Sequence, residues 1–350
     1  MTPKSAFIKW SLIGTVVAGI LIAGQVTELG GAAGLLQVGE TSSLRPMIEE
    51  QLGDIPLTEF GGHDGQIFYA MGLDLDGDQI SDVLDHGAFR YRRILYPFLA
   101  SLGGLLDGYP LLYGMITIAV LSMGLAAGSI AAIAAKFDRS DWLALVVVLN
   151  PGMWLSIRLL TSDALAKATM ALGLLAVVSG WRVTAGLFAV STLSKDVYLI
   201  TPAGLMADRA TRRWSWALVP AVALAVWATV LTITMGEGFT GRGNLDWPFA
   251  GPITASDNWG ALDGGELLYL GFALLSVAVG LGYGLVRRSW LRWPILGWSL
   301  LAIISSNWVW DFGNNAARAF APIVLLVATA EAAHGMPIQP PTTSRRNLPV

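Results

Sequence analysis

The chain contains no cysteine in its 350 residues and only three histidines. Without thiols there can be no disulfide, no thiolate metal site and no cysteine nucleophile. Charged residues are also scarce: they make up 13% of the chain, against roughly 25% in a typical soluble domain. A net charge of −3 gives no support for nucleic-acid binding.

Apolar residues make up 54% of the chain and occur in long runs without strand-like alternation. A helix needs roughly 20 residues to cross a bilayer, and in lipid only helices and closed barrels satisfy their own backbone hydrogen bonds. These runs predict an all-α polytopic membrane protein of about 8–11 transmembrane helices, some short or broken. The clear candidates are 10–27, 110–135, 142–157, 164–180, 214–235, 267–286, 293–309 and 316–330.

Two further apolar stretches do not fit a simple span. Residues 94–106 are few for a full crossing, and 183–207 carry Lys195 and Asp196 at their middle. An unpaired charge inside a membrane is costly and usually marks a functional site. We interpret both stretches as short, broken or re-entrant helices that line a cavity.

Basic residues gather in the short connections on one predicted face, which the positive-inside rule makes cytoplasmic. This orientation places both termini in the cytoplasm of a multi-pass plasma-membrane protein. The basic residues are Lys4, Lys9, Lys136, Arg139, Arg182, Arg209, Arg212, Arg213, Arg287, Arg288, Arg292, Arg345 and Arg346.

We expect one transmembrane domain over residues 1–334, followed by a disordered cytoplasmic tail at 335–350 that is rich in Pro, Ser and Thr. A long first outer loop at 28–93 and a second at 236–265 hold most of the polar sequence. Within the first loop, apolar residues recur at helical spacing after Pro46, which predicts a helix lying flat on the membrane. These residues are Leu44, Met47, Ile48, Leu52 and Ile55.

The first outer loop also holds two unusual blocks, Gly-His-Asp-Gly-Gln-Ile-Phe-Tyr at 62–69 and Phe-Arg-Tyr-Arg-Arg-Ile-Leu-Tyr-Pro at 89–97. A carboxylate such as Asp64, flanked by glycine, can act as a general base on a bound hydroxyl. The alternative is that Asp64 and Gly65 only close a turn. Arg90, Arg92 and Arg93 oppose the positive-inside preference and suit a phosphate, or alternatively the headgroups of anionic lipids.

An acidic stretch between these blocks has the spacing of a calcium loop. Its carboxylates fall at relative positions 1, 3, 5, 9 and 12, which resembles loops that wrap Ca²⁺ or Mg²⁺ in oxygen ligands. Gln79 stands where such loops usually have a turn glycine. The alternative is a solvated acidic loop. The candidate ligands are Asp74, Asp76, Asp78, Asp82 and Asp85.

Together with Asn-Pro at 150–151 and Ser-Asp-Ala-Leu at 162–165, the two blocks resemble bacterial members of the GT-C superfamily of membrane glycosyltransferases, including mannosyltransferase-like enzymes. The resemblance implies a GT-C-like helical bundle and an inverting transfer of a hexose or pentose. The donor would be a polyprenyl-phosphate sugar, and the acceptor a hydroxyl at the outer membrane face. Many members carry two adjacent acids in this loop, whereas here Gly65 follows Asp64.

The resemblance also implies roles for individual residues. Asp64 matches the family's first-loop acid and would be the general base. The stretch around Lys195 and Asp196 resembles the superfamily's short helix pair with a central lysine. Lys195 would meet the lipid phosphate, or alternatively would form an ion pair with Asp196 or with an acid on another helix. The expected substrate contacts are His63, Gln66, Tyr69, Arg90, Tyr91, Arg93, Lys195 and Arg318.

Two other functions fit parts of the sequence. A transporter or lipid flippase would also use broken helices and a lysine within the membrane. A cation-binding scaffold would make the acidic stretch the main feature but would leave Arg90 and Arg93 unexplained. Sugar transfer, unlike transport or cation binding, should depend on Asp64.

Overall fold

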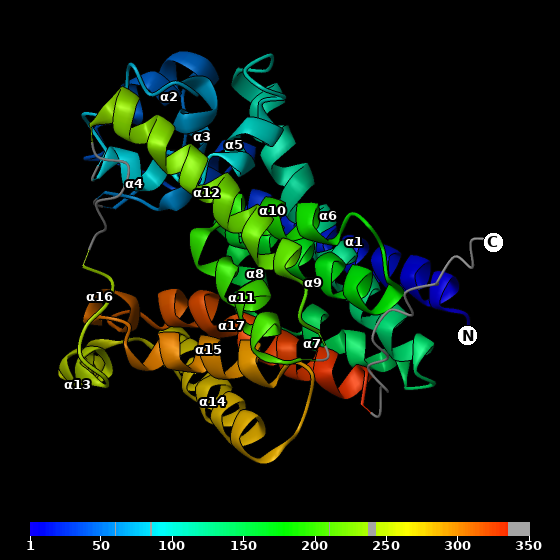
Figure 1. The fold of residues 1–350 in the computed structure, drawn as a ribbon. Coiled ribbons are helices and arrows are strands. Elements are labelled where there is room, and N and C mark those ends of the chain that lie inside the picture. The colour runs from blue at the N-terminus through cyan, green and yellow to red at the C-terminus, as the bar shows by residue number, and fades with distance from the viewer. Residues whose placement is uncertain (60, 85, 210, 237–242, 335–350) are drawn as a thin grey trace.

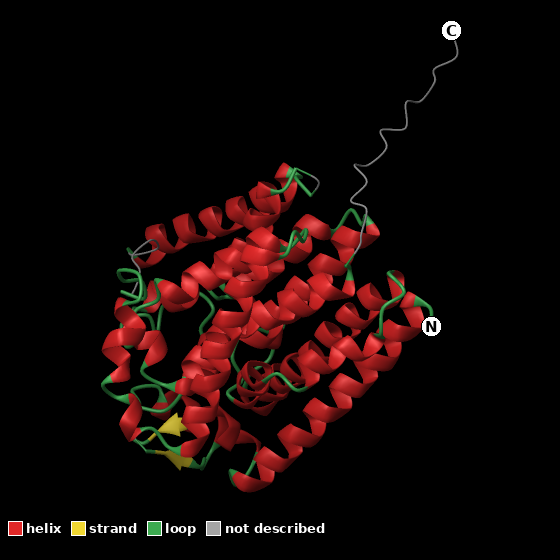
Figure 2. Ribbon diagram, turned by 90° about the horizontal axis from the view of Figure 1, so that it is seen from below, coloured by secondary structure: helices red, strands yellow, loops and turns green. Residues whose placement is uncertain are grey.

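The computed structural model describes residues 1–59, 61–84, 86–209, 211–236 and 243–334. Helices dominate this part of the chain (Figures 1 and 2). Its only sheet is the parallel pair of β1 (Val38–Gly39) and β2 (Leu57–Thr58) in the first loop. The predicted all-α class is therefore confirmed.

Five of the described helices are long and apolar enough to cross a bilayer. All five coincide with predicted spans, which supports the assignment to a membrane. They are α1 (Pro3–Glu28), α6 (Gly108–Lys136), α12 (Trp214–Met235), α14 (Gly264–Val286) and α17 (Gly313–Ala332).

Two predicted spans are not continuous helices. The stretch 142–157 is divided into η2 (Asp141–Ala144), α7 (Leu145–Val148) and α8 (Pro151–Arg158). Proline disfavours helical backbone in the residue before it, and Asn150 instead caps α8 by accepting the Met153 N–H at 3.0 Å.

The stretch 293–309 is likewise split, into α15 (Arg292–Ile303) and α16 (Asn307–Trp310). The predicted span at 164–180 corresponds to α9 (Asp163–Ser179), which has only 17 residues. A continuous crossing was therefore the wrong prediction for 142–157 and 293–309.

The break predicted within 183–207 is confirmed. Lys195 has extended backbone, φ −158° and ψ 115°, between α10 (Thr184–Ser194) and the pair η3 (Asp196–Leu199) and α11 (Ile200–Ala207). Ser191 of α10 donates to the Ala166 carbonyl at 2.8 Å, and Thr201 of α11 lies against Met170 at 3.2 Å. Both arms of this re-entrant hairpin thus follow α9, with Lys195 at the tip. The stretch 94–106 contains only the short helix α5 (Leu95–Ala100).

The helix predicted after Pro46 is present as α2 (Arg45–Leu52), but its apolar face does not lie on the membrane. Leu44, Ile48 and Leu52 are buried, since α2 packs on α6 and on α3 (Asp64–Leu73). The first loop also contains η1 (Ala32–Leu36) and α4 (Gly87–Tyr91), and the second contains α13 (Ala250–Ser256) and η4 (Trp259–Ala261). The tail predicted at 335–350 lies outside the described residues.

Side-chain contacts join segments that the charge pattern placed on the same face. At one end, Lys9 pairs with Asp141 at 2.8 Å, and Arg139 donates to the His334 carbonyl at 3.4 Å. The start of α1 and the end of α17 both lie toward the right of Figure 1. At the other end, the Trp259 indole donates to the Trp310 carbonyl at 3.0 Å. We call these the basic end and the loop end.

Small residues bring α1 and α6 into close contact. Gly124 and Gly128 form a Gly-x-x-x-Gly spacing on α6, a pattern that lets membrane helices approach closely. A Cβ at Gly124 would lie 2.5 Å from the Ser11 carbonyl oxygen, and one at Gly128 would lie 2.7 Å from that of Phe7. The α1–α6 interface therefore has no room for side chains at these two positions.

We expect Gly128→Leu to force α1 away from α6 and to lower the free energy of unfolding by about 1–3 kcal/mol through overpacking. Gly19→Leu is the matched control, because nothing lies within 4 Å of the Cβ that it would add. Thermal unfolding of both variants in detergent checks this. Equal midpoints for the two variants would contradict the close packing of α1 on α6.

Candidate functional site

Asp64 is the first residue of α3, where a carboxylate interacts favourably with the positive end of the helix dipole. The preceding turn folds against β1, and His63 donates its N–H to the Gln37 carbonyl at 3.1 Å. Gly62 has φ +76°, and a Cβ there would overlap the backbone of Gln37 and Gly39. Glycine at 62 is thus needed to place Asp64.

Two arginines from distant parts of the chain hold the Asp64 carboxylate. Arg90 of α4 contacts Oδ1 at 3.1 Å, and both terminal nitrogens of Arg318 in α17 contact Oδ2 at 3.2 Å. Arg318 also donates to the Asn315 side chain at 2.9 Å. The structure thus brings together three of the predicted site residues, and the resulting cluster joins the first loop to the last long helix.

The cations determine the charge state of Asp64. Burial alone would raise the pKa of the Asp64 carboxyl, but Arg318, then Arg90 and Arg93, outweigh that effect and hold the pKa well below its usual range. Asp64 is therefore ionised at neutral pH. In this arrangement it is also a weak base.

Arg93 lies beside this group and forms no ion pair with a described carboxylate. Its guanidinium stacks on the Phe89 ring, 5.1 Å from the centroid, and its Nε is buried without a hydrogen-bond partner. Among the described residues, none forms an ion pair with Arg93. Burial lowers the pKa of Arg93, although Asp196 and Asp64 oppose this. A partly buried guanidinium without a counter-ion is suited to bind an anion.

Neighbouring Arg92 points to a different partner, Asp196 of η3, at 3.5 Å. Asp196 also lines a cavity of about 410 Å³ between the re-entrant hairpin and α12. The other lining residues are apolar: Val197, Leu199, Ile200, Ala203 and Leu224. An apolar space therefore begins beside Asp196 and its partner Arg92.

A second ion pair lies at the tip of the re-entrant hairpin. Lys195 contacts Asp163, the first residue of α9, at 2.5 Å. One turn further along α9, Lys167 is fully buried and donates to the Ser156 hydroxyl at 2.7 Å and to the Gly152 carbonyl at 3.2 Å. Asp163, at the start of α9, is the counter-ion of Lys195.

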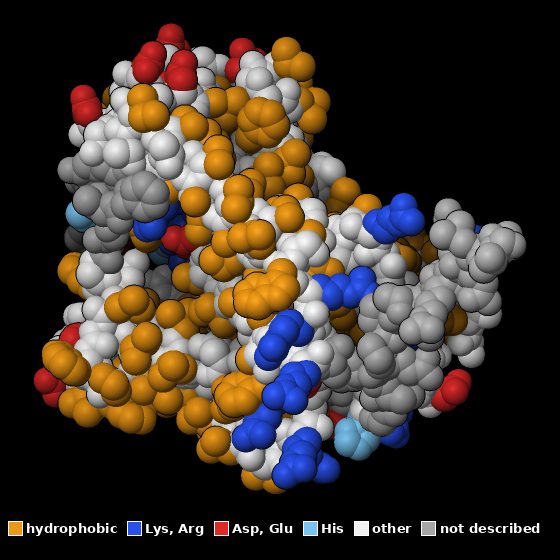
Figure 3. All heavy atoms as spheres, in the orientation of Figure 1, with side chains coloured by type: hydrophobic (Ala, Val, Ile, Leu, Met, Phe, Trp, Pro, Cys, Tyr) orange, Lys and Arg blue, Asp and Glu red, His pale blue; other side chains and the backbone are white. Residues whose placement is uncertain are grey.

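The two ion-pair groups are electrostatically connected. Asp163 raises the pKa of Asp64, in opposition to the arginines, and also acts on the pKa of Arg93. Figure 3 shows basic and acidic side chains together in a hollow at the left edge, between surfaces that are mostly apolar. We refer to Asp64, Arg90, Arg93, Arg318 and the Lys195–Asp163 pair as the charged cluster.

Other predicted substrate contacts do not reach the charged cluster. Tyr69 and Tyr91 are fully buried and donate to the carbonyls of Gly108 at 3.1 Å and Asp74 at 2.5 Å. Gln66 is buried and donates to the Gly61 carbonyl at 2.5 Å. These three side chains hold the first loop in shape. His63 is exposed, and its ring forms no hydrogen bond with Asp64 in the described structure.

The predicted metal site is not formed by the described residues. Asp74 accepts the N–H groups of Gln79 at 3.0 Å and Ile80 at 2.9 Å. Oδ2 of Asp74 therefore closes the loop, whereas Oδ1 is buried without a hydrogen-bond partner among the described residues. No three histidine, aspartate or glutamate side chains converge in the described ranges. This holds for Asp74, Asp76, Asp78 and Asp82, whereas Asp85 lies outside those ranges.

Sequence reasoning also missed Lys167 and Arg158. The sequence could have identified Lys167 as a candidate, because a lysine in an otherwise apolar helix needs a partner. Arg158, whose Nε is buried without a partner among the described residues, acts electrostatically on His63. It ends a stretch that was interpreted as an ordinary span.

Comparison of the chain with protein-family models, curated proteins and solved structures finds no match. The function must therefore be inferred from the site itself.

We predict strong coupling between Lys195 and Asp163. Lys195→Met or Asp163→Asn alone leaves one buried charge without a partner and should cost about 3–5 kcal/mol of stability. The double variant removes both charges and should be clearly more stable than either single variant. Thermal unfolding of all four proteins checks this. Additive losses in the double variant would mean that the two residues do not form a pair.

Proposed function

We propose that this protein is a GT-C-like inverting glycosyltransferase with about 8–11 membrane crossings, counting its short and broken helices. Its donor is a hexose or pentose carried on a polyprenyl phosphate, and its acceptor is a hydroxyl group. The site is the charged cluster at the loop end, which the basic residues of the opposite end orient toward the outer face.

The observation that carries this proposal is Arg93, a guanidinium that forms no ion pair with the described residues, in a cluster that also contains Arg90 and Arg318. Cations held in a partly dry site bind phosphate oxygens more strongly than cations in water. The apolar cavity lies beside Asp196, which pairs with Arg92 and also acts on the pKa of Arg93. Together they match a ligand with a phosphate at the end of a hydrocarbon chain.

Asp64 is the group in this cluster that can take a proton. In the proposed step, the acceptor hydroxyl attacks the anomeric carbon and its proton passes to the Asp64 carboxylate. The bond from the anomeric carbon to the phosphate oxygen breaks, and its electron pair stays on that oxygen. Polyprenyl phosphate leaves with one more negative charge, which Arg90, Arg93 and Arg318 stabilise.

The ion pairs of Asp64 connect donor binding to this proton transfer. Without a ligand, Arg90 and Arg318 are paired with Asp64 and make it a weak base. A donor phosphate competes with the carboxylate for the same guanidinium groups. As the phosphate takes over these contacts, the pKa of Asp64 rises toward a value useful for a base. The base would thus become effective only when the donor is bound.

Lys195 has a supporting place in this scheme. It is already paired with Asp163 at 2.5 Å, so Arg93, which forms no ion pair with the described residues, is the first partner for the donor phosphate. The Lys195–Asp163 pair fixes the tip of the re-entrant hairpin, and η3 and α11 then form one wall of the apolar cavity.

The test uses purified protein in liposomes, a panel of short polyprenyl-phosphate hexoses and pentoses, and acceptors from membrane extracts. We expect release of polyprenyl phosphate with at least one donor. Asp64→Asn should lower the rate by about 10²–10⁴-fold, the usual contribution of a general base. Asp54→Asn, which changes an exposed acid of the same loop, should leave the rate unchanged.

Two results would contradict the proposal. One is an Asp64→Asn variant that releases the carrier at the wild-type rate. The other is movement of the intact lipid-linked sugar between leaflets without cleavage, which would indicate a transporter or flippase.

A further inference from the structure

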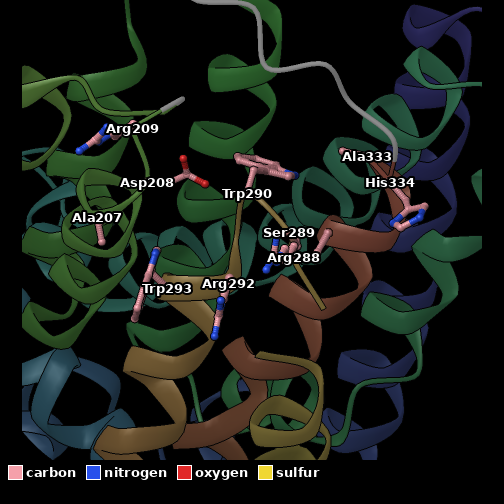
Figure 4. Close-up of a pocket in the computed structure, with 11 residues that line it drawn as sticks. Ala207, Asp208, Arg209, Arg288, Ser289, Trp290, Arg292, Trp293, Ala333 and His334 are labelled. Carbon is pink, nitrogen blue, oxygen red and sulfur yellow. The ribbon is translucent and has the colours of Figure 1, made fainter. Parts of the chain in front are cut away.

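A second cavity, of about 600 Å³, lies at the basic end. None of the residues that line it belongs to the charged cluster. The end of α11, the connection from α14 to α15 and the end of α17 surround it. Figure 4 shows Asp208 and Arg209 on one side, Ala333 and His334 on the other, and Ser289 to Arg292 between them. The lining residues are Ala207, Asp208, Arg209, Arg288, Ser289, Trp290, Arg292, Trp293, Ala330, Ala333 and His334.

The lining of this cavity is cationic. Arg209 follows the end of α11, whereas Arg288 lies in the connection between α14 and α15 and Arg292 begins α15. Asp208 is the single carboxylate among the residues that line the cavity. Nothing in the sugar-transfer scheme uses these side chains. Arginines converging from two segments favour an anionic ligand, because the guanidinium groups otherwise repel one another.

Two buried donors at the cavity lack acceptors in the described part of the chain. The Nε of Arg292 and the indole nitrogen of Trp290 are inaccessible to solvent and form no hydrogen bond there. Only 4% of the Trp290 surface is exposed. Leaving a buried N–H without an acceptor is costly. The cavity thus adjoins two donors that the described residues leave unsatisfied.

The side chains around the cavity are typical of the boundary between lipid and water. Trp293 is 45% exposed and packs against the Arg292 guanidinium at 5.3 Å. Leu285 and Val286, at the end of α14 next to Arg288, are 65% and 79% exposed. Indoles, arginines and exposed aliphatic side chains occur together at the headgroup level of membrane proteins. Acyl chains can therefore lie along α14 while a headgroup enters the cavity.

We infer that this cavity binds the phosphate headgroup of an anionic phospholipid, with Arg209, Arg288 and Arg292 around the phosphate. Basic pockets between transmembrane helices on the cytoplasmic side are suited to such headgroups. The bound lipid joins the ends of α11, α15 and α17, so it stabilises the fold at the end opposite the proposed active site. This inference is independent of the proposed sugar transfer.

The experiment measures thermal unfolding in detergent during titration with phosphatidylglycerol, phosphatidylcholine or inorganic phosphate. We expect only phosphatidylglycerol to raise the Tm of the wild type. The variant Arg288→Gln/Arg292→Gln should need about 30-fold more of this lipid for the same rise, since it loses two basic contacts. Arg287→Gln is the matched control, because Arg287 is an exposed neighbour that does not line the cavity.

A second variant protects the test against a folding defect in the double variant. Arg209 is exposed on the far side of the cavity, and Arg209→Gln should need about fivefold more phosphatidylglycerol. Equal sensitivity of Arg209→Gln and Arg287→Gln would overturn the inference. So would an equal rise with phosphatidylcholine, or a rise with inorganic phosphate that matches phosphatidylglycerol and so indicates a free anion.

Discussion

The ion pairs of Asp64 with Arg90 and Arg318 are the constraint on which the rest of the loop end depends. They join α3 and α4 of the first loop to α17, the last long helix, and Asp64 and Arg318 are 254 positions apart in the sequence. A carboxylate and two guanidinium groups in a partly dry site each need the others, because an unpaired charge there is costly. The first loop is therefore fixed over the ends of the spans.

This constraint leaves positive charge without a carboxylate among the described residues. Asp64 occupies Arg90 and Arg318, Asp163 occupies Lys195, and Arg93 remains beside them, stacked on the Phe89 ring. The broken backbone at Lys195 leads into η3, whose Asp196 pairs with Arg92 and lines an apolar cavity. A site with surplus cations and an adjoining apolar space is chemically matched to a lipid phosphate. The basic end repeats the same principle with different residues.

The sequence predicted the elements that depend on residues close together in the chain. It did not predict the contacts between residues that are far apart in the chain. Long apolar runs identified the five long helices, and Lys195 within such a run marked the break in the hairpin. Composition could not show that Pro151 divides the apolar run 142–157 into separate helices, although the length of the run predicted one span. The unusual blocks drew attention to Asp64, Arg90 and Tyr91 alike, because residues that shape a loop and residues that serve its chemistry stand in the same motif. The partner of Asp163 lies 32 positions away, which no spacing rule could reveal.

We propose above all that Arg93, together with its neighbouring arginines at the loop end, holds a lipid phosphate. Native mass spectrometry of protein extracted with its own lipids tests this most directly, comparing wild type with Arg93→Gln and with Arg45→Gln, which changes a first-loop arginine paired with Glu49. We expect polyprenyl phosphate or its sugar conjugate on the wild type and on Arg45→Gln, and its loss from Arg93→Gln. Retention of the same carrier lipid by Arg93→Gln, or ordinary phospholipids alone on all three proteins, would contradict the account.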